Sequence, residues 1–132
     1  MDDGGSTVTQ YTVTSDPDEL TVTATGFDAG LIVTDDFGSG DNKGYAMAVS
    51  DNGKLLVGGY AYNGTDDDFA LARYDSDGTL DTTFGSSGRT ITDFAYGNDV
   101  IYDLTMLADG KIVVVGYAYN GSDSDFALAR YS

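Results

Sequence analysis

Aspartate has the greatest capacity for chemistry in this chain, because the 132 residues include no His and no Cys. Closely spaced carboxylates occur in the predicted turns 63–68 (NGTDDD), 75–81 (DSDGTLD) and 120–125 (NGSDSD). Ca²⁺ takes several oxygen ligands, and carboxylates gathered in a turn supply them. Ca²⁺ is therefore the candidate cofactor. The candidate metal ligands are Asp66, Asp68, Asp75, Asp77, Asp81, Asp123 and Asp125.

A second interpretation of these aspartates is structural. A short carboxylate bonds nearby backbone N–H groups, so aspartates also cap turns and solvate loop tips. The segment 75–81 lacks the third loop carboxylate and the terminal Glu of an EF-hand. Turn capping therefore stays open beside metal binding.

Two other side-chain types in the same region suggest carbohydrate chemistry. Asn63 and Asn120 each begin an N-x-[ST] acceptor for glycosylation, although Asn-Gly is also the preferred pair of a two-residue hairpin turn. Tyrosines next to these loops can stack on sugar rings, or they can pack in the core and interfaces. These tyrosines are Tyr60, Tyr62, Tyr117 and Tyr119.

Catalysis has little support in the sequence. There is no His, no Cys and no Ser in a nucleophile-elbow context. Paired aspartates serve as acid and base in glycoside hydrolysis, but here both copies of a repeat carry much the same residues, whereas catalytic centres are usually unique. The sequence predicts a protein that is not an enzyme and has no catalytic residues.

The element that must position these residues is a repeat. Residues 55–74 and 112–131 are identical at 15 of 20 positions. The repeat period is the constant number of residues that separates equivalent positions, such as 55 and 112. A fixed period is the mark of a repeat architecture. Alternating apolar and polar residues predict strands separated by turns, and nothing has helical spacing over a useful length. Within one period the predicted strands are 45–49, 54–62, 68–74 and 89–93, named A to D. The second period supplies 101–106, 111–119 and 125–131.

Composition agrees with an all-β fold and limits the partners. The net charge is −16, from Lys+Arg 6 and Asp+Glu 22, which argues against nucleic acid and anionic membranes as partners. No apolar run approaches the length of a membrane span, so membrane insertion is not expected. Met1-Asp2-Asp3 is not the basic start of a signal peptide.

Four antiparallel strands per period are typical of a β-propeller blade. The string GYAYNGTDDDFALARYDSDGTLDTTFG, followed by TITDF and ADGKIVVVGY, resembles the delta-60 repeat, a β-propeller-like repeat of bacteria and archaea. The resemblance covers about residues 27–132. It implies blades in secreted or cell-surface proteins, with no established enzymatic activity. Such propellers usually carry many repeats, whereas this chain has about two.

We therefore expect an all-β fold of about two four-stranded antiparallel β-propeller-like blades with an N-terminal strand extension. Residues 1–26 are the extension and a potential donor strand, 27–74 the first repeat and 75–132 the second. The second repeat lacks its D strand, while the period places a spare one at 32–36. An unpaired edge is a template for another chain. The predicted donor residues are Leu31, Ile32, Val33, Thr34, Asp35 and Asp36.

The function expected from this pattern is structural self-assembly. Strand donation would join copies head to tail into a filament or a closed propeller ring, with the chain itself as partner. The family resemblance implies that the protein is located outside the cell or at the cell surface. A compact single chain whose two ends meet is the alternative arrangement. A lectin-like module that binds Ca²⁺ or carbohydrate is the alternative function.

Overall fold

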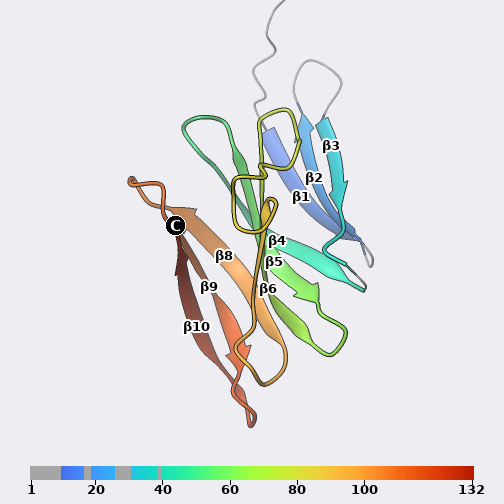
Figure 1. Ribbon diagram of the computed structural model, residues 1–132, viewed down its shortest axis with the longest axis vertical. Helices are drawn as coiled ribbons and strands as arrows, with labels where there is room; N and C mark the ends of the chain where they lie inside the picture. The colour runs from blue at the N-terminus through green and yellow to red at the C-terminus, as the bar shows by residue number, and fades with distance from the viewer. Residues whose placement is uncertain (1–9, 17–18, 26–30, 39) are drawn as a thin grey trace, which may run out of the picture.

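The computed structural model describes residues 10–16, 19–25, 31–38 and 40–132, and these residues form strands, turns and loops but no helix (Figure 1). No helix long and apolar enough to cross a membrane occurs in this part of the chain. The ten strands are β1 (Gln10–Asp16), β2 (Glu19–Thr25), β3 (Leu31–Asp35), β4 (Asn42–Val49), β5 (Leu55–Tyr62), β6 (Asp67–Tyr74), β7 (Arg89–Thr92), β8 (Asp99–Met106), β9 (Ile112–Tyr119) and β10 (Ser124–Tyr131).

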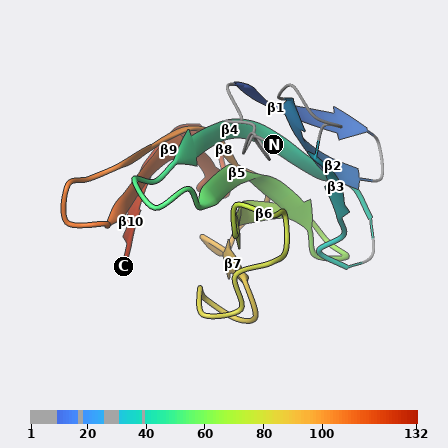
Figure 2. The ribbon, with the colours of Figure 1, turned by 90° about the horizontal axis from the view of Figure 1, so that it is seen from above.

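The strands form three antiparallel sheets, which Figure 2 shows side by side. The N-terminal sheet has the order β1-β2-β3, the central sheet β4-β5-β6-β7 and the C-terminal sheet β10-β9-β8. The central sheet is a four-stranded propeller-like blade whose strands follow chain order. The C-terminal sheet has the first three strands of a second blade. The predicted fold class is therefore confirmed.

The two repeats fold alike down to their irregularities. In the central sheet the register shifts between Gly44 and Ala46, and in the C-terminal sheet it shifts one period later, between Ile101 and Asp103. Each shift lies opposite a glycine. A Cβ on Gly59 would come within 1.8 Å of the Lys43 carbonyl oxygen, so the backbones approach there as only glycine permits.

The turn after β5 is longer than the two residues that an Asn-Gly pair often forms. The hairpin between β5 and β6 has a four-residue loop, because Tyr62 pairs with Asp67 and the Asn63 N–H donates to the Asp66 carbonyl. The Asn-Gly pair therefore begins a longer loop instead of forming a two-residue turn. Gly64 still supplies the positive φ, at 107°.

The core lies on both faces of the central sheet. One face carries Phe69 and Leu71 of β6, which belong to a buried cluster with Ile101 and Leu104 of the C-terminal sheet. The opposite face carries Ala72 and Tyr74, with Phe37, Met47 and Leu80 packed beside them. This division of β6 into two faces follows from the two-residue period of a strand.

Sheets and sequence repeats do not share boundaries. The central sheet ends with β7, which lies in the repeat assigned to residues 75–132. The N-terminal sheet likewise runs past residue 26, since its third strand is β3. This offset arises because the central blade is closed by β7, which follows the repeated hairpin β5–β6 in the chain.

Candidate functional site

The asparagines at the two repeated loops hold those loops together. The Asn63 amide donates to carboxylates of Asp66 (2.7 Å) and Asp68 (2.8 Å), and its oxygen accepts the Thr65 N–H. Both N–H groups of this amide are therefore used within the loop. A glycan on Asn63 would replace one of them, so the contacts favour the hairpin role of this residue.

The second copy repeats this arrangement. The Asn120 amide donates to Asp123 and Asp125, each at 2.7 Å, and accepts the Ser122 N–H. The predicted calcium ligands of both loops thus converge on an asparagine side chain. Their contacts are those of loop closure.

The aspartates of 75–81 bind cationic side chains of the chain itself. Lys54 Nζ lies 2.6 Å from Asp75 and 2.8 Å from Asp81, and Arg73 Nε lies 2.7 Å from Asp81. Lys54, with Thr83 and Arg73, holds the pKa of the Asp81 carboxyl well below its usual range. Asp77 instead caps its own turn through Thr79. The Lys54 ammonium group therefore contacts Asp75 and Asp81, for which the sequence suggested a metal ion.

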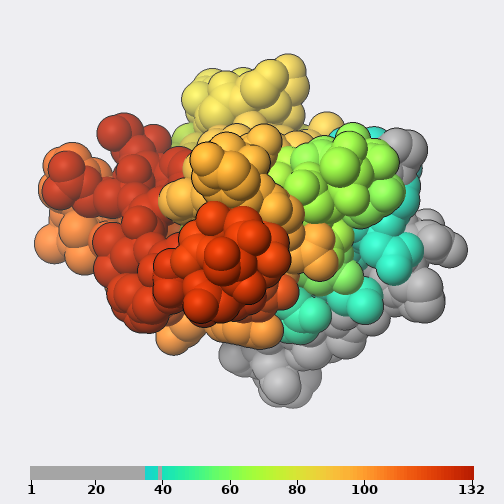
Figure 3. Space-filling view, turned by 90° about the horizontal axis from the view of Figure 1, so that it is seen from below, coloured from blue at the N-terminus to red at the C-terminus, as the bar shows by residue number. Residues whose placement is uncertain are grey.

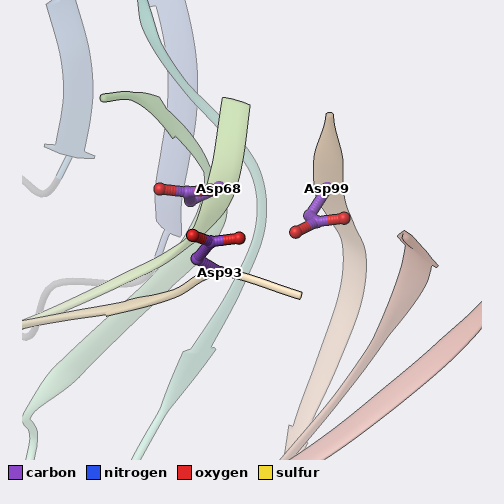
Figure 4. Close-up of side chains that lie close together, drawn as sticks. All are labelled: Asp68, Asp93 and Asp99. Atoms are coloured by element: carbon purple, nitrogen blue, oxygen red, sulfur yellow. The ribbon is translucent and has the colours of Figure 1, made fainter. Parts of the chain in front are cut away.

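The structure instead places one predicted ligand, Asp68, beside Asp93 and Asp99, two carboxylates that the sequence did not single out. Oxygens of Asp68, Asp93 and Asp99 all lie within 4.8 Å of one another. In the described ranges this is the one group of three acidic side chains so arranged. Figure 4 shows Asp93 next to Asp68, and Asp99 entering from β8 on the other side. We call these three residues the blade-junction cluster.

Three chain segments meet at the cluster. Asp68 lies near the start of β6, Asp93 follows β7, and Asp99 is the first residue of β8. The loops 63–66, 93–98 and 120–123 lie next to one another at this end of the molecule (Figure 3). The Asp67 N–H also donates to the Asn98 side chain, at 3.1 Å. The cluster is therefore positioned by the junction between the two blades.

Two members of the cluster are buried. Asp68 is 3% exposed and Asp99 is fully buried, while Asp93 is exposed. Burial raises the pKa of both buried carboxyls, and the neighbouring aspartates add to the rise. Asp99 accepts the N–H groups of Phe94 (2.9 Å) and Tyr119 (3.2 Å). No Lys or Arg of the described chain forms an ion pair with the cluster.

A row of tyrosines crosses both blades on another part of the surface. Tyr45 lies against Tyr60 (6.2 Å between ring centroids) and against Tyr102 (5.6 Å), and Tyr102 against Tyr117 (5.7 Å). Tyr45 and Tyr102 come from the A strands and were not among the predicted tyrosines. Their separation by one repeat period is the signal that relates them. Among the predicted tyrosines, Tyr60 and Tyr117 join this row.

The outer edge of β10 is the second candidate site. β7 covers the matching edge of β6, whereas no strand of the described chain pairs with this edge of β10. Phe126 and Leu128 are 76% and 58% exposed, but their repeat equivalents Phe69 and Leu71 are 0% and 1% exposed. The same sequence, DFALARY, is thus a core strand in one blade and a surface strand in the other.

The predicted donor residues form β3 within the chain. β3 pairs with β2, with Leu20 opposite Asp35 and Val22 opposite Val33. Asp35 is 8% exposed and bonds to Arg89 and to the Tyr74 hydroxyl (2.9 Å). β3 is therefore anchored beside the central blade. Asp36 follows β3, and its carboxylate accepts from the Asn42 amide at 3.2 Å.

The comparisons with known proteins agree with this architecture. A family model described as a domain of unknown function (DUF5122) β-propeller matches residues 51–84 and 107–132. These segments contain the hairpins β5–β6 and β9–β10. No curated protein matches the chain. Residues 51–84 and 107–132 thus carry a β-propeller-like repeat.

Proposed function

We propose that this protein is a structural subunit that assembles head to tail, with β3 of one copy completing the C-terminal blade of the next. The carrying observation is the contrast between β6 and β10. Identical side chains are buried in the blade that has four strands and exposed in the blade that has three. An exposed, unpaired strand edge pairs readily with another chain.

The register of the two blades supports β3 as the partner of β10. In the central blade Leu71 lies opposite Thr90 and Phe69 opposite Thr92. Shifting β6 forward by one period and β7 back by one period places Leu128 opposite Val33. The same shift places Phe126 opposite Asp35.

In the single chain, β2 occupies the position that this register gives to β10. Val22 lies opposite Val33 and Leu20 opposite Asp35. β2 therefore pairs with β3 in the same register, shifted by one period, in which β6 pairs with β7. The proposal is therefore an exchange in which β10 of a neighbouring copy replaces β2. β3 stays beside its own central blade, and the bonds of Asp35 to Arg89 and Tyr74 are kept.

The exchange also buries the exposed face of β10. In the chain, the ring of Phe69 packs edge-on against Phe94, with 5.1 Å between centroids. One period earlier than Phe94 is Phe37, which lies on the opposite face of the central blade. Phe126 of one copy would thus meet Phe37 of the next.

Such a contact joins two different surfaces, so it generates a ring or a filament. Figure 2 places β10 at one end of the molecule and β3 at the other, as a head-to-tail contact requires. Each copy would contribute two complete blades. Three or four copies would match the roughly four to eight blades of known propellers.

Engineered cysteines test the exchange, because the chain has no native Cys. The pair Val22→Cys and Val33→Cys would lock β2 onto β3, so we expect a monomer by light scattering when oxidised and assembly after reduction. In the pair Val33→Cys and Leu128→Cys, a disulfide should link different copies. Thr34→Cys with Leu128→Cys is the control, because a one-residue slip turns the side chain to the other face.

Two results would refute the proposal. One is a wild-type protein that stays monomeric at every concentration. The other is an oligomer that persists unchanged when β2 is locked to β3. Negative-stain images of the assembled protein distinguish a ring from a filament.

The finer family assignment belongs to the same proposal. The string DFALARY…DG-x-LD-x-x-FG supports the delta-60 repeat, and that resemblance alone supports an extracellular or cell-surface location. A carbohydrate-binding module is the second candidate function. It is favoured by the tyrosine row, in which Tyr45 is 48% and Tyr102 57% exposed. Glycan-array binding by a stable monomer would support it over assembly.

A further inference from the structure

We propose that the blade-junction cluster of Asp68, Asp93 and Asp99 binds one Ca²⁺ ion, which holds the two blades together. The ligand oxygens lie within 4.8 Å of one another. Two oxygens on opposite sides of a Ca²⁺ ion, each at about 2.4 Å, are separated by about this distance. The spacing is thus compatible with a single hard cation between the three carboxylates.

An unsatisfied buried oxygen points to the same ligand. Asp68 Oδ2 accepts a hydrogen bond from Asn63, but Oδ1 is buried and has no hydrogen-bond partner. In folded proteins such groups are almost always paired, since an unpaired one loses its hydration without compensation. The carboxylate that carries this oxygen is a member of the cluster, and Asp68 is 3% exposed. A bound cation would satisfy it.

The preceding blade junction serves as an internal comparison. One period before Asp93 and Asp99 are Asp36 and Asn42. The Asn42 amide donates to the Asp36 carboxylate at 3.2 Å, and Asn42 is 1% exposed. A neutral amide therefore donates a hydrogen bond to the carboxylate at that junction. At the later junction the amide is replaced by a carboxylate, which brings another negative charge and no donor.

The position of the cluster gives the ion a structural effect. Asp68 belongs to the central blade, Asp99 to the C-terminal blade and Asp93 to the segment between them. Without a cation, three close carboxylates repel one another across the junction. With a bound cation, the same carboxylates coordinate one ion and thereby link the two blades. Ca²⁺ should therefore raise the stability of the folded chain.

The test is calorimetric titration with CaCl₂ together with thermal melting in CaCl₂ or chelator. We expect one site per chain with a dissociation constant on the order of 10⁻⁴ M or tighter. At a 100-fold excess of Ca²⁺ over that constant, the melting temperature should rise by roughly 5–10 °C. Titration with MgCl₂ at equal ionic strength controls for general screening of the acidic chain.

Two variants that each remove one charge from β8 complete the design. Asp99→Asn installs the residue found at the preceding junction, so it should fold without Ca²⁺ and lose the calcium response. Asp103→Asn removes an exposed carboxylate from the same strand and should keep that response. The proposal is overturned if Asp99→Asn responds to Ca²⁺ like the wild type. It is also overturned if Ca²⁺ gives neither heat nor a melting shift beyond that of Mg²⁺.

Discussion

The repeated phenylalanine offers a matched test of the two strand environments. Phe69 and Phe126 share the sequence DFALARY, but their exposed fractions are 0% and 76%. Substituting Leu at each position makes the same chemical change between the same adjacent residues of the sequence. Effects on local strand propensity and on the unfolded chain should therefore cancel between the two variants. What remains is the difference in packing.

The expected magnitudes follow from burial. Complete truncation of a buried Phe to Ala costs about 3–5 kcal/mol, which a marginally stable domain does not always survive. Leu keeps much of the apolar volume, so Phe69→Leu should lower the free energy of unfolding by about 1–2 kcal/mol. The edge-on contact with Phe94 is lost as well. Phe126→Leu should stay within about 0.5 kcal/mol in the monomer.

Urea unfolding followed by far-ultraviolet circular dichroism measures both values, at a concentration where light scattering finds monomers. If Phe126→Leu costs as much as Phe69→Leu under these conditions, β10 is covered within one chain, and the contrast between the blades is wrong. At higher concentration the cost of Phe126→Leu should grow. Association would then bury the ring that the monomer exposes.

Two further perturbations test the ion pairs and the close backbone approach. Because Lys54, Thr83 and Arg73 lower the pKa of Asp81 in the folded chain, its contribution is complete above the unfolded pKa of about 3.9 and is lost as pH falls through the folded value. Asp81→Asn should thus lower the urea midpoint at pH 7, because Lys54 keeps only Asp75 as its partner. The variant should also lose less stability than the wild type as the pH falls. An equal loss of stability on acidification in the variant and the wild type would contradict this. Gly59→Ala should cost at least about 2 kcal/mol or prevent folding, because its Cβ would clash with the Lys43 carbonyl. In Gly110→Ala the added Cβ meets no atom within 4 Å, and the variant should lose about 1 kcal/mol of stability because φ at this position is 81°. Similar urea midpoints for Gly59→Ala and Gly110→Ala would contradict the close approach of the backbones at Gly59.

Much of the fold was predictable because strands leave a local signal. The alternation of apolar and polar residues indicated the strands, and turn residues marked the reversals. The bounds of β5 and β6 differ from their predicted ranges by one residue at the start. The exact length of the loop after Tyr62 was not predictable, because the Asn63 side chain closes the loop by bonds to Asp66 and Asp68, and no dipeptide rule contains those bonds.

The candidate sites were predictable only in part. The unpaired edge of β10 in the described chain was predictable by counting positions along the repeat period. The pairing of β2 with β3 did not, because β2 shares the register of β6 but not its sequence. The aspartates of 75–81 were expected to attract a metal ion, but Lys54 reaches them from the turn between β4 and β5, which is distant in sequence.

By itself, the sequence determined the repeat, the strand class and the phase of the blades, since these depend on local periodicity and on the spacing between copies. Only the tertiary structure decided which carboxylates meet. Asp68 is distant in the chain from Asp93 and Asp99, and the packing of one blade on the next brings the oxygens of all three within 4.8 Å of one another. The aspartates that stand closest in sequence instead bond to the amides and ammonium groups beside them. Proximity along the chain favours turn capping, whereas a cation site at the blade junction requires side chains that the sheets bring together.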